Sequence, residues 1–170
     1  MSTMKNIRIE KITLNIGAGK DQARLEKGIM LLNTLTNLTP VRTITNKRIQ
    51  EWGLRPGLPI GCKLTLRKGR ALEILPRLLN AVENRLSEKQ FDNNGNIAFG
   101  IHEYIEISGV KYDPKIGIMG LEVCVTLERP GYRVKKRRLL ARKIPIRHRI
   151  SKQEAIDFMS KSFNTRVEAM

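Results

Sequence analysis

Residues 59–67 read PIGCKLTLR, and within them apolar and polar side chains alternate from residue 60 onward. In a β-strand, successive side chains point to opposite faces, so this alternation predicts one apolar and one polar face. The polar face would carry Gly61, Lys63, Thr65 and Arg67. A strand of this kind is typical of an antiparallel sheet that packs on its core with one side only. The stretch therefore predicts a sheet whose other side is available to a partner.

Similar patterns on both sides of this stretch predict further strands. Residues 7–16 alternate with a phase slip at Glu10 and Lys11, which predicts a β-bulge. Additional strands are predicted over residues 41–45, 101–107 and 119–128.

Three helices are predicted between and after these strands. The first follows its N-cap Asp21 and ends before Pro40, and the last begins at Ser151, where Glu154 completes a capping box. The middle helix spans residues 69–86, with Leu72, Leu75, Leu79, Val82 and Leu86 on one seam, and Pro76 should kink or split it. We therefore expect an α+β fold, mainly an antiparallel sheet with helices packed on one face and the opposite face free.

The charge of the chain points to a polyanionic partner. Its 170 residues contain 32 Lys and Arg against 16 Asp and Glu, which gives a net charge of +16. Nucleic acid and an anionic membrane surface are the candidate partners. The chain has no apolar run of 18 residues, and its first residues lack a signal-peptide pattern, so we expect a cytoplasmic protein without a membrane span.

The positive charge is concentrated in residues 129–149, which we call the basic arm. The basic arm holds ten of the 32 basic residues and none of the acidic ones. Pro130, Gly131 and Pro145 and the weak apolar periodicity predict an extended arm or long loop that is disordered until it meets RNA. A nuclear-localisation or membrane-surface patch is the alternative, although the basic arm does not have the pattern of an amphipathic helix.

Catalytic, metal and cofactor sites are not predicted. Cys62 and Cys124 lie far apart, with only His102 and His148 as possible co-ligands, so we expect two buried, reduced thiols and no metal. The turn after residue 16 matches neither the dinucleotide fingerprint nor the phosphate loop. A non-enzymatic nucleic-acid binder is the leading hypothesis; the alternatives are a subunit of a nucleic-acid-processing enzyme and a nonspecific architectural binder.

The candidate RNA-binding residues fall on the free face of the sheet and on the basic arm. On the sheet they are hydrogen-bond donors without a negative charge among them: Thr13, Asn15, Lys63, Thr65 and Arg67, joined by Arg42 or Thr43. On the basic arm they are Arg133, Lys135, Lys136, Arg137, Arg138, Arg142, Lys143, Arg147, His148 and Arg149. An ordinary solvated sheet face is the alternative reading. Strand 119–128 carries Glu122 and Glu128 outward, so we expect that edge to face away from RNA.

The loop over residues 46–59 is a second candidate surface. Its basic residues Lys47, Arg48 and Arg55 surround Trp52, the single tryptophan of the chain. An exposed tryptophan can stack on a nucleobase, but a lone one usually anchors packing, so we expect Trp52 to be buried.

Three separated blocks of sequence span the body of the chain: IEKITLNIGAG at 9–19, PIGCKLTLR at 59–67 and FDNNGNIAFGI at 91–101. These blocks resemble ribosomal protein L-five, the large-subunit protein that binds 5S rRNA. RPGYRVKKRR at 129–138 and RHRISKQEAIDFM at 147–159 resemble the archaeal and eukaryotic branch of this family.

The resemblance implies a non-enzymatic ribosomal protein without a cofactor. It implies one domain over residues 1–170, with halves at about 5–58 and 59–164, that attaches 5S rRNA to the large subunit at the central protuberance. The sheet face would meet 5S rRNA, and Lys47, Arg48, Trp52 and Arg55 would reach P-site tRNA. Residues 108–118 would bridge to proteins of the small-subunit head. Large-subunit rRNA and neighbouring ribosomal proteins are the further partners.

Overall fold

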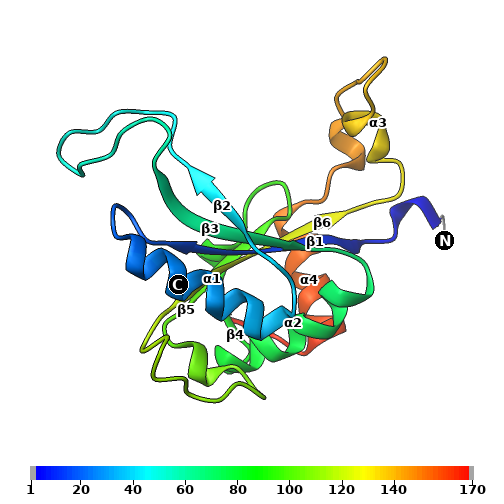
Figure 1. Cartoon of the computed structure of the whole chain (residues 1–170). Coiled ribbons are helices and arrows are strands. Elements are labelled where there is room, and N and C mark those ends of the chain that lie inside the picture. Colours follow the sequence, from blue (N-terminus) through cyan, green and yellow to red (C-terminus); the bar gives the residue numbers. More distant parts are fainter. Residues whose placement is uncertain (1–2, 169–170) are drawn as a thin grey trace.

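A five-stranded antiparallel sheet forms the centre of the computed structural model, which describes residues 3–168 (Figure 1). Its strands lie in the order β2-β3-β1-β6-β5. Their bounds are Arg8–Gly17 for β1, Val41–Ile44 for β2, Pro59–Leu66 for β3, Ile97–Ile101 for β5 and Leu121–Glu128 for β6. The prediction of an α+β fold with an antiparallel sheet is confirmed.

The apolar alternation sets the register of the central strands. Leu14 of β1 lies opposite Leu64 of β3 on one side and opposite Val123 of β6 on the other. All three side chains are buried, because the alternation of each strand turns the same face toward the core. The register shifts between Ile9 and Lys11, as the phase slip in the sequence predicts.

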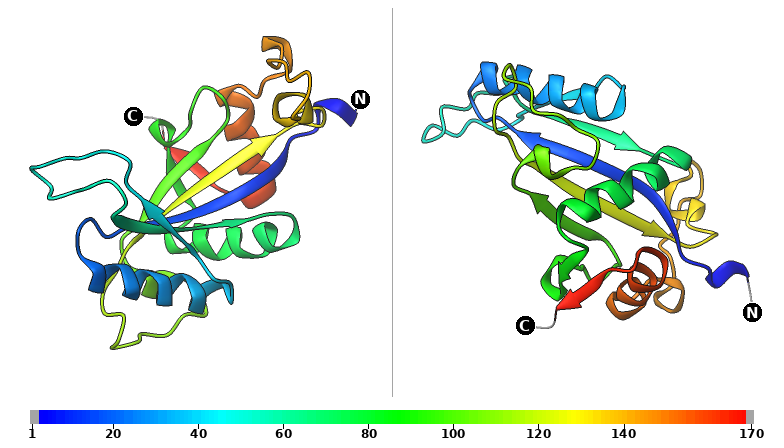
Figure 2. Two further views of the ribbon diagram at one scale, coloured as in Figure 1. Left: turned by 45° about the horizontal axis from the view of Figure 1, so that its top comes forward. Right: turned by 90° about the horizontal axis from the view of Figure 1, so that it is seen from below.

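Three helices lie on the same side of this sheet (Figures 1 and 2). They are α1 (Gln22–Thr36), α2 (Gly69–Ala81) and α4 (Lys152–Phe163). Asp21 caps α1, since its Oδ1 accepts hydrogen bonds from the backbone N–H groups of Ala23 at 2.9 Å and Arg24 at 3.3 Å. The capping box of Ser151 and Glu154 at the start of α4 is present as predicted.

A second, two-stranded sheet was not predicted. β4 (Arg85–Ser87) pairs in parallel with β7 (Arg166–Glu168). It joins the segment after α2 to the segment after α4, and Leu86 at its centre is buried.

The prediction of a helix over residues 69–86 is wrong at its end and at Leu72, whereas Leu75 and Leu79 of the predicted seam are buried. α2 ends at Ala81, and Glu83 and Asn84 then adopt the left-handed backbone conformation, which stops the helix. Leu72 is exposed, and the buried face consists of Ala71, Ile74, Leu75, Leu78 and Leu79.

Pro76 neither splits α2 nor ends it. The ring is exposed, so the carbonyl group that loses its hydrogen-bond donor lies toward solvent rather than toward the core.

The predicted strand over residues 101–107 is also wrong. The strand in this region is β5, and Tyr104–Glu106 form a 3-10 helix instead. Tyr104 is fully buried and its hydroxyl oxygen accepts a hydrogen bond from the backbone N–H of Asp113 at 2.9 Å, which fixes the turn. In β5 the outward positions are Ala98 and Gly100, and such small side chains obscure the alternation in the sequence.

Candidate nucleic-acid interface

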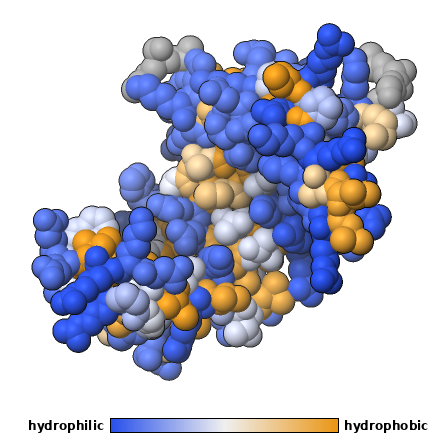
Figure 3. Space-filling view, turned by 90° about the horizontal axis from the view of Figure 1, so that it is seen from above, coloured by the Kyte–Doolittle hydropathy of each residue, from blue (hydrophilic) through white to orange (hydrophobic). Residues whose placement is uncertain are grey.

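The side of the sheet opposite α1, α2 and α4 carries most of the predicted RNA-binding residues of the strands. We call this side the open face; on the three central strands its residues are Lys11, Thr13, Asn15, Lys63, Thr65, Glu122, Cys124 and Thr126. Thr13 lies opposite Thr65, and Asn15 lies opposite Lys63, so the register brings these four together. Figure 3 looks onto this side, where hydrophilic residues dominate both ends of the molecule and less polar ones the middle.

Of the two candidates on β2, Thr43 is the one that the register assigns to the open face. Thr43 lies opposite Gly61, whereas Arg42 lies opposite Cys62, whose side chain is buried in the core. Directly opposed residues of antiparallel strands share a face, so the side chain of Arg42 leaves the sheet on the helix side.

Acidic residues also lie on this side of the sheet, contrary to the sequence-based expectation. The strand that carries Glu122 and Glu128 is not an edge but pairs with β1 in the interior of the sheet. Asn15 Nδ2 donates a hydrogen bond to Glu122 Oε2 at 3.1 Å, so the amide group of Asn15 is oriented by this carboxylate. The open face is therefore mixed in charge rather than uniformly basic.

A cluster of ion pairs docks the basic arm on the sheet. Lys136, at the end of the short helix α3 (Arg133–Lys136), lies 2.7 Å from Glu10 Oε1 and 3.1 Å from Glu128 Oε2. Arg67 and Arg8 complete the cluster, at 3.3 Å from Glu10 and 2.8 Å from Glu128. The Glu10 side chain is only 10% exposed. Its burial raises its pKa, but the hydrogen bond and charge of Lys136, together with the charge of Lys11 and the hydrogen bond from Arg67, outweigh burial and leave the pKa below the ordinary value.

The two ends of the basic arm pack against each other. Tyr132 donates a hydrogen bond from its hydroxyl to the carbonyl oxygen of His148 at 3.3 Å. Nε2 of His148 lies 2.9 Å from the carbonyl oxygen of Pro130, which can only accept, so this nitrogen carries the proton. The expectation of an arm without folded elements is wrong here, because α3 and a 3-10 helix at Ile146–His148 lie within it.

Most predicted RNA contacts of the basic arm are exposed. The exposed ones are Arg133, Lys135, Lys136, Arg137, Arg138, Arg142, Lys143, Arg147 and Arg149. Only His148 among the predicted contacts of the basic arm is partly buried. Arg129, which precedes them, is buried and ion-paired with Glu154 at 2.7 Å.

The loop before β3 projects from the sheet at the end opposite the basic arm (Figure 1). An isolated bridge between Ile49 and Leu54 closes its tip, and Leu54 is buried beneath it. Trp52 is 65% exposed, so the expectation that it is buried is wrong: Leu54, not the tryptophan, fills the loop. Lys47, Arg48 and Arg55 are exposed on the same loop.

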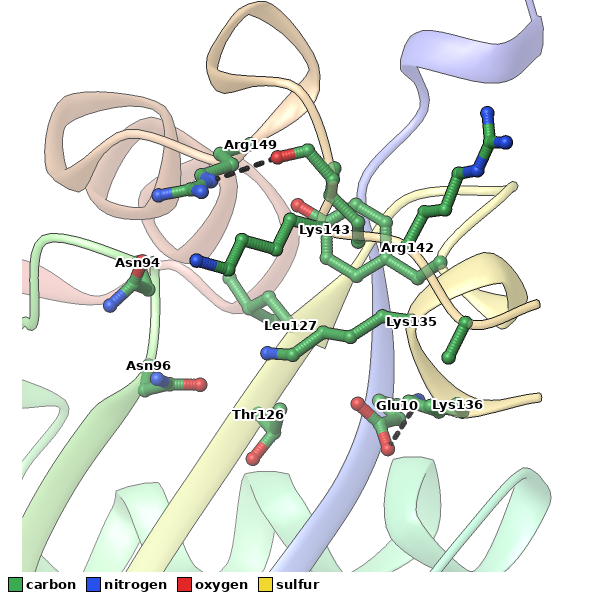
Figure 4. Close-up of a pocket in the computed structure, with 13 residues that line it drawn as sticks. Glu10, Asn94, Asn96, Thr126, Leu127, Lys135, Lys136, Arg142, Lys143 and Arg149 are labelled. Atoms are coloured by element: carbon green, nitrogen blue, oxygen red, sulfur yellow. Dashed lines mark hydrogen bonds and ion pairs between the residues drawn. The ribbon is translucent and has the colours of Figure 1, made fainter. Parts of the chain in front are cut away.

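A pocket of about 480 Å³ lies between the basic arm, β1, β6 and the turn before β5 (Figure 4). Its polar lining combines arm residues with Glu10, Thr126 and two asparagines, Asn94 and Asn96. Sequence reasoning missed the asparagines, although the Asn-rich turn at residues 92–96 was a signal for them.

The cysteines and histidines form no site within the described residues. Cys62 is buried, and burial raises its pKa to about 11; Cys124 is only partly buried, which corrects the expectation of two buried thiols. Within residues 3–168, no three His, Cys, Asp or Glu side chains are grouped so as to hold a metal ion. No helix in this described part is both long and apolar enough to cross a bilayer.

Comparison with protein families gives two matches that together span most of the chain. A family described as "Ribosomal protein L5" matches residues 2–55, and a second one, described as the C-terminus of the ribosomal L5 family, matches residues 59–158. The second match covers 100 of the 170 residues by itself.

Curated archaeal proteins resemble the chain over almost its whole length. The "Large ribosomal subunit protein uL5" of Sulfolobus acidocaldarius is 47% identical over 166 residues, which cover 98% of this chain and 93% of the relative. The protein of the same description from Sulfurisphaera tokodaii is 46% identical, with 98% and 95% covered. That of Nanoarchaeum equitans is 47% identical, with 96% and 97% covered.

Proposed function

The chain belongs to the ribosomal protein L5 family, and on this premise we propose that it attaches 5S rRNA to the large ribosomal subunit at the central protuberance. Membership makes it a structural, non-enzymatic constituent of the large subunit, with rRNA and ribosomal proteins as its partners. The contact with 5S rRNA, and the residues that make it, are the proposal.

The observation that carries the proposal is the uncovered side of the sheet between two basic projections. Lys63 and Thr65 are exposed at its centre, and no side-chain hydrogen bond or ion pair within the described residues occupies either of them. The loop at residues 46–58 and the basic arm rise on the two sides (Figure 1). The free donors of Lys63 and Thr65 at the centre and the cations on both sides suit the backbone and ribose groups of an RNA helix.

Recognition would rest on RNA shape more than on stacked bases. The chain has four Phe, three Tyr and one Trp. None of the open-face residues is aromatic. Sequence-specific sheet binders use exposed aromatic rings as stacking platforms, so a face of threonines, an asparagine and lysines favours phosphate and 2′-hydroxyl contacts.

Two further contacts belong to the same proposal. The exposed loop residues Lys47, Arg48, Trp52 and Arg55 would reach P-site tRNA, since an exposed indole among cations can stack on a base while the cations hold its phosphates. Residues 108–118, where Tyr112 and Ile118 are exposed, would bridge to the proteins of the small-subunit head.

A binding titration tests the contact with 5S rRNA. The purified protein is titrated against 5S rRNA and a control RNA of equal length, at two salt concentrations. We expect a preference for 5S rRNA that persists at the higher salt, because shape recognition adds to the electrostatic contribution. Equal and steeply salt-sensitive binding to both RNAs would contradict specific recognition.

A matched pair of variants tests which side of the sheet binds. Lys63→Gln removes a charge from the open face, and Lys27→Gln removes one from the exposed side of α1. We expect the first to weaken 5S rRNA binding about three- to tenfold and the second by less than about twofold. Equal losses would place the contact elsewhere.

A further inference from the structure

The pocket beside the basic arm has the size and chemistry of a ligand site. Its volume of about 480 Å³ falls within the range of about 300–1,000 Å³ that is typical of small-ligand clefts. Tyr132 is the partly exposed apolar residue of the lining, whereas Leu127 and Ile144 are buried. A phosphate group alone would fill only a part of such a space.

Three cations of the pocket form no ion pair with an acidic residue among the described residues. Lys135 and Lys143 make no ion pair and no side-chain hydrogen bond with the described residues. Arg149 donates from Nε to the carbonyl oxygen of Ile144 at 3.2 Å, which fixes the side chain and leaves its terminal nitrogens without an acidic partner in residues 3–168. Figure 4 shows the ends of these three side chains on the side where Asn94 and Asn96 lie, whereas Arg142 extends away.

The one acid of the pocket does not cancel these charges. Glu10 is engaged by Lys136 at 2.7 Å and by Arg67 at 3.3 Å. The pocket is therefore strongly positive, and an anionic group that enters it replaces no existing ion pair of Lys135, Lys143 or Arg149 with the described residues.

The two asparagines offer acceptors in a fixed orientation. Nδ2 of Asn94 and Nδ2 of Asn96 both donate to Asp92 Oδ2, each at 3.2 Å. The hydrogen bonds from Asn94 and Asn96 lower the pKa of Asp92, so this carboxylate stays ionised and can only accept. Both side-chain oxygens are consequently left as acceptors, and in Figure 4 the oxygen of Asn96 is directed toward Thr126 and Lys135.

We propose that this pocket binds a single nucleotide of rRNA that is turned out of its helix. Lys135, Lys143 and Arg149 hold its phosphate. The oxygens of Asn94 and Asn96 accept hydrogen bonds from the exocyclic amino group of its base, and Tyr132 contacts the base surface. The inference rests on the proposed function, because it assumes an RNA partner, but it assigns a separate subsite away from the strand residues Lys63 and Thr65.

The acceptor pair predicts a preference among bases. An exocyclic amino group has two N–H donors, whereas uracil has only its N3–H on the edge that pairs with other bases. We therefore expect adenine or cytosine nucleotides to bind more tightly than uridine nucleotides, and all of them more tightly than inorganic phosphate.

Mononucleotides test the pocket without a structured RNA. The full chain, labelled with ¹⁵N, is titrated with AMP, CMP, UMP and inorganic phosphate while backbone and side-chain amide signals are followed by NMR. We expect saturable shifts of the side-chain amides of Asn94 and Asn96 with AMP and CMP, and at least threefold weaker binding of UMP. Shifts that are equal for phosphate and AMP would overturn the nucleotide assignment, and shifts spread over the whole basic arm would overturn the pocket.

Two double variants with the same loss of charge provide the control. Lys135→Gln with Lys143→Gln removes two cations that line the pocket, while Arg138→Gln with Arg147→Gln removes two exposed cations of the same basic arm outside it. We expect the first pair to weaken AMP binding about tenfold and the second by less than about twofold. Equal effects would overturn the pocket as the site.

The outcome is separable from the 5S rRNA test. Specific 5S rRNA binding without localised mononucleotide binding would overturn the pocket and leave the proposed function intact. Localised mononucleotide binding without a preference for 5S rRNA would support the pocket and overturn the proposed attachment of 5S rRNA.

Discussion

The Nη2 atom of Arg129 lies 2.7 Å from Oε1 of Glu154, so the first residue of the basic arm is tied to the first turn of α4. Nη1 of the same arginine donates to the carbonyl oxygen of Arg149 at 3.1 Å, which lies at the other end of the basic arm. One buried guanidinium therefore holds both ends of a highly charged segment against the folded body.

Glu154→Gln should destabilise the protein by about 1.5–3 kcal/mol, because it leaves the Arg129 charge buried without a counter-charge. Urea unfolding followed by circular dichroism measures this change. Glu88→Gln is the control: it removes the partner of Lys152 in an ion pair that is 2.8 Å long but more exposed, and it should cost less than about 1 kcal/mol. Equal effects would contradict the role of the buried pair.

The same contact should make stability depend on pH in the acidic range. The backbone hydrogen bond from Ser151, together with Arg129 and against the opposing effect of burial, lowers the pKa of Glu154 below 4.5. A group whose pKa is lower in the folded state stabilises fully above its unfolded pKa, and this contribution is lost as the pH falls through the folded pKa. The stability difference between wild type and Glu154→Gln should therefore be constant above about pH 5 and shrink below about pH 4.5, as unfolding curves at several pH values would show.

Breaking the contact between α3 and the sheet should loosen the basic arm without unfolding the body. Lys136→Met removes the cation that Glu10 and Glu128 share, so residues 137–142 should be cleaved by trypsin several-fold faster. Arg85→Met breaks an exposed pair with Glu83 far from the basic arm and serves as the control. Unchanged cleavage of the Lys136 variant would show that the ion-pair cluster does not restrain the arm.

The exposed arginines of the basic arm should account for much of the salt dependence of RNA binding. Arg133→Gln, Arg138→Gln and Arg147→Gln together should lower the slope of log K against log salt by about 0.7–0.9 for each phosphate that is no longer neutralised. Filter binding at four salt concentrations gives the slope. An unchanged slope would show that these side chains do not touch RNA.

Gly61 of β3 and Gly100 of β5, both on the open face, should differ in how replacement by alanine changes the stability of the protein. A Cβ atom at Gly61 would lie 2.6 Å from the carbonyl oxygen of Ile16, so Gly61→Ala should destabilise the protein by about 1–3 kcal/mol. A Cβ atom at Gly100 meets nothing within 4 Å, and Gly100→Ala should be neutral or slightly stabilising. Thermal unfolding of both variants checks the contrast, which a similar loss in both would refute.

Local patterns predicted the elements whose signal lies within a few residues. β3 follows from its own alternation, α1 from Asp21 and its apolar spacing, and α4 from its capping box. The end of α2 could not be predicted in this way. The helix stops where Glu83 and Asn84 adopt positive φ angles, which are uncommon for residues other than glycine, so the residue types do not indicate the stop.

Contacts between distant segments were beyond the sequence patterns. Because β6 lies in the interior of the sheet, Glu122 lies beside Asn15, although the two are 107 residues apart in the sequence. Glu122 thereby adds a negative charge to the open face. The nucleotide pocket likewise unites Glu10, Asn94, Thr126 and Lys143 from four separate stretches. In the loop before β3, Leu54 is buried and Trp52 is exposed. This depends on side-chain packing, which the spacing of residues in the sequence does not determine.

The first strand of the sheet along the chain, β1, is also its middle strand. β1 can pair with β3 as soon as residues 59–66 have emerged from the ribosome, but its other edge stays unpaired until residues 121–128 have emerged. At a synthesis rate of about 5–20 residues per second, this delay is on the order of ten seconds, during which an aggregation-prone strand edge is exposed. Nascent chains stalled before residue 121 should therefore recruit strand-binding chaperones, and chains stalled well past residue 128 should release them.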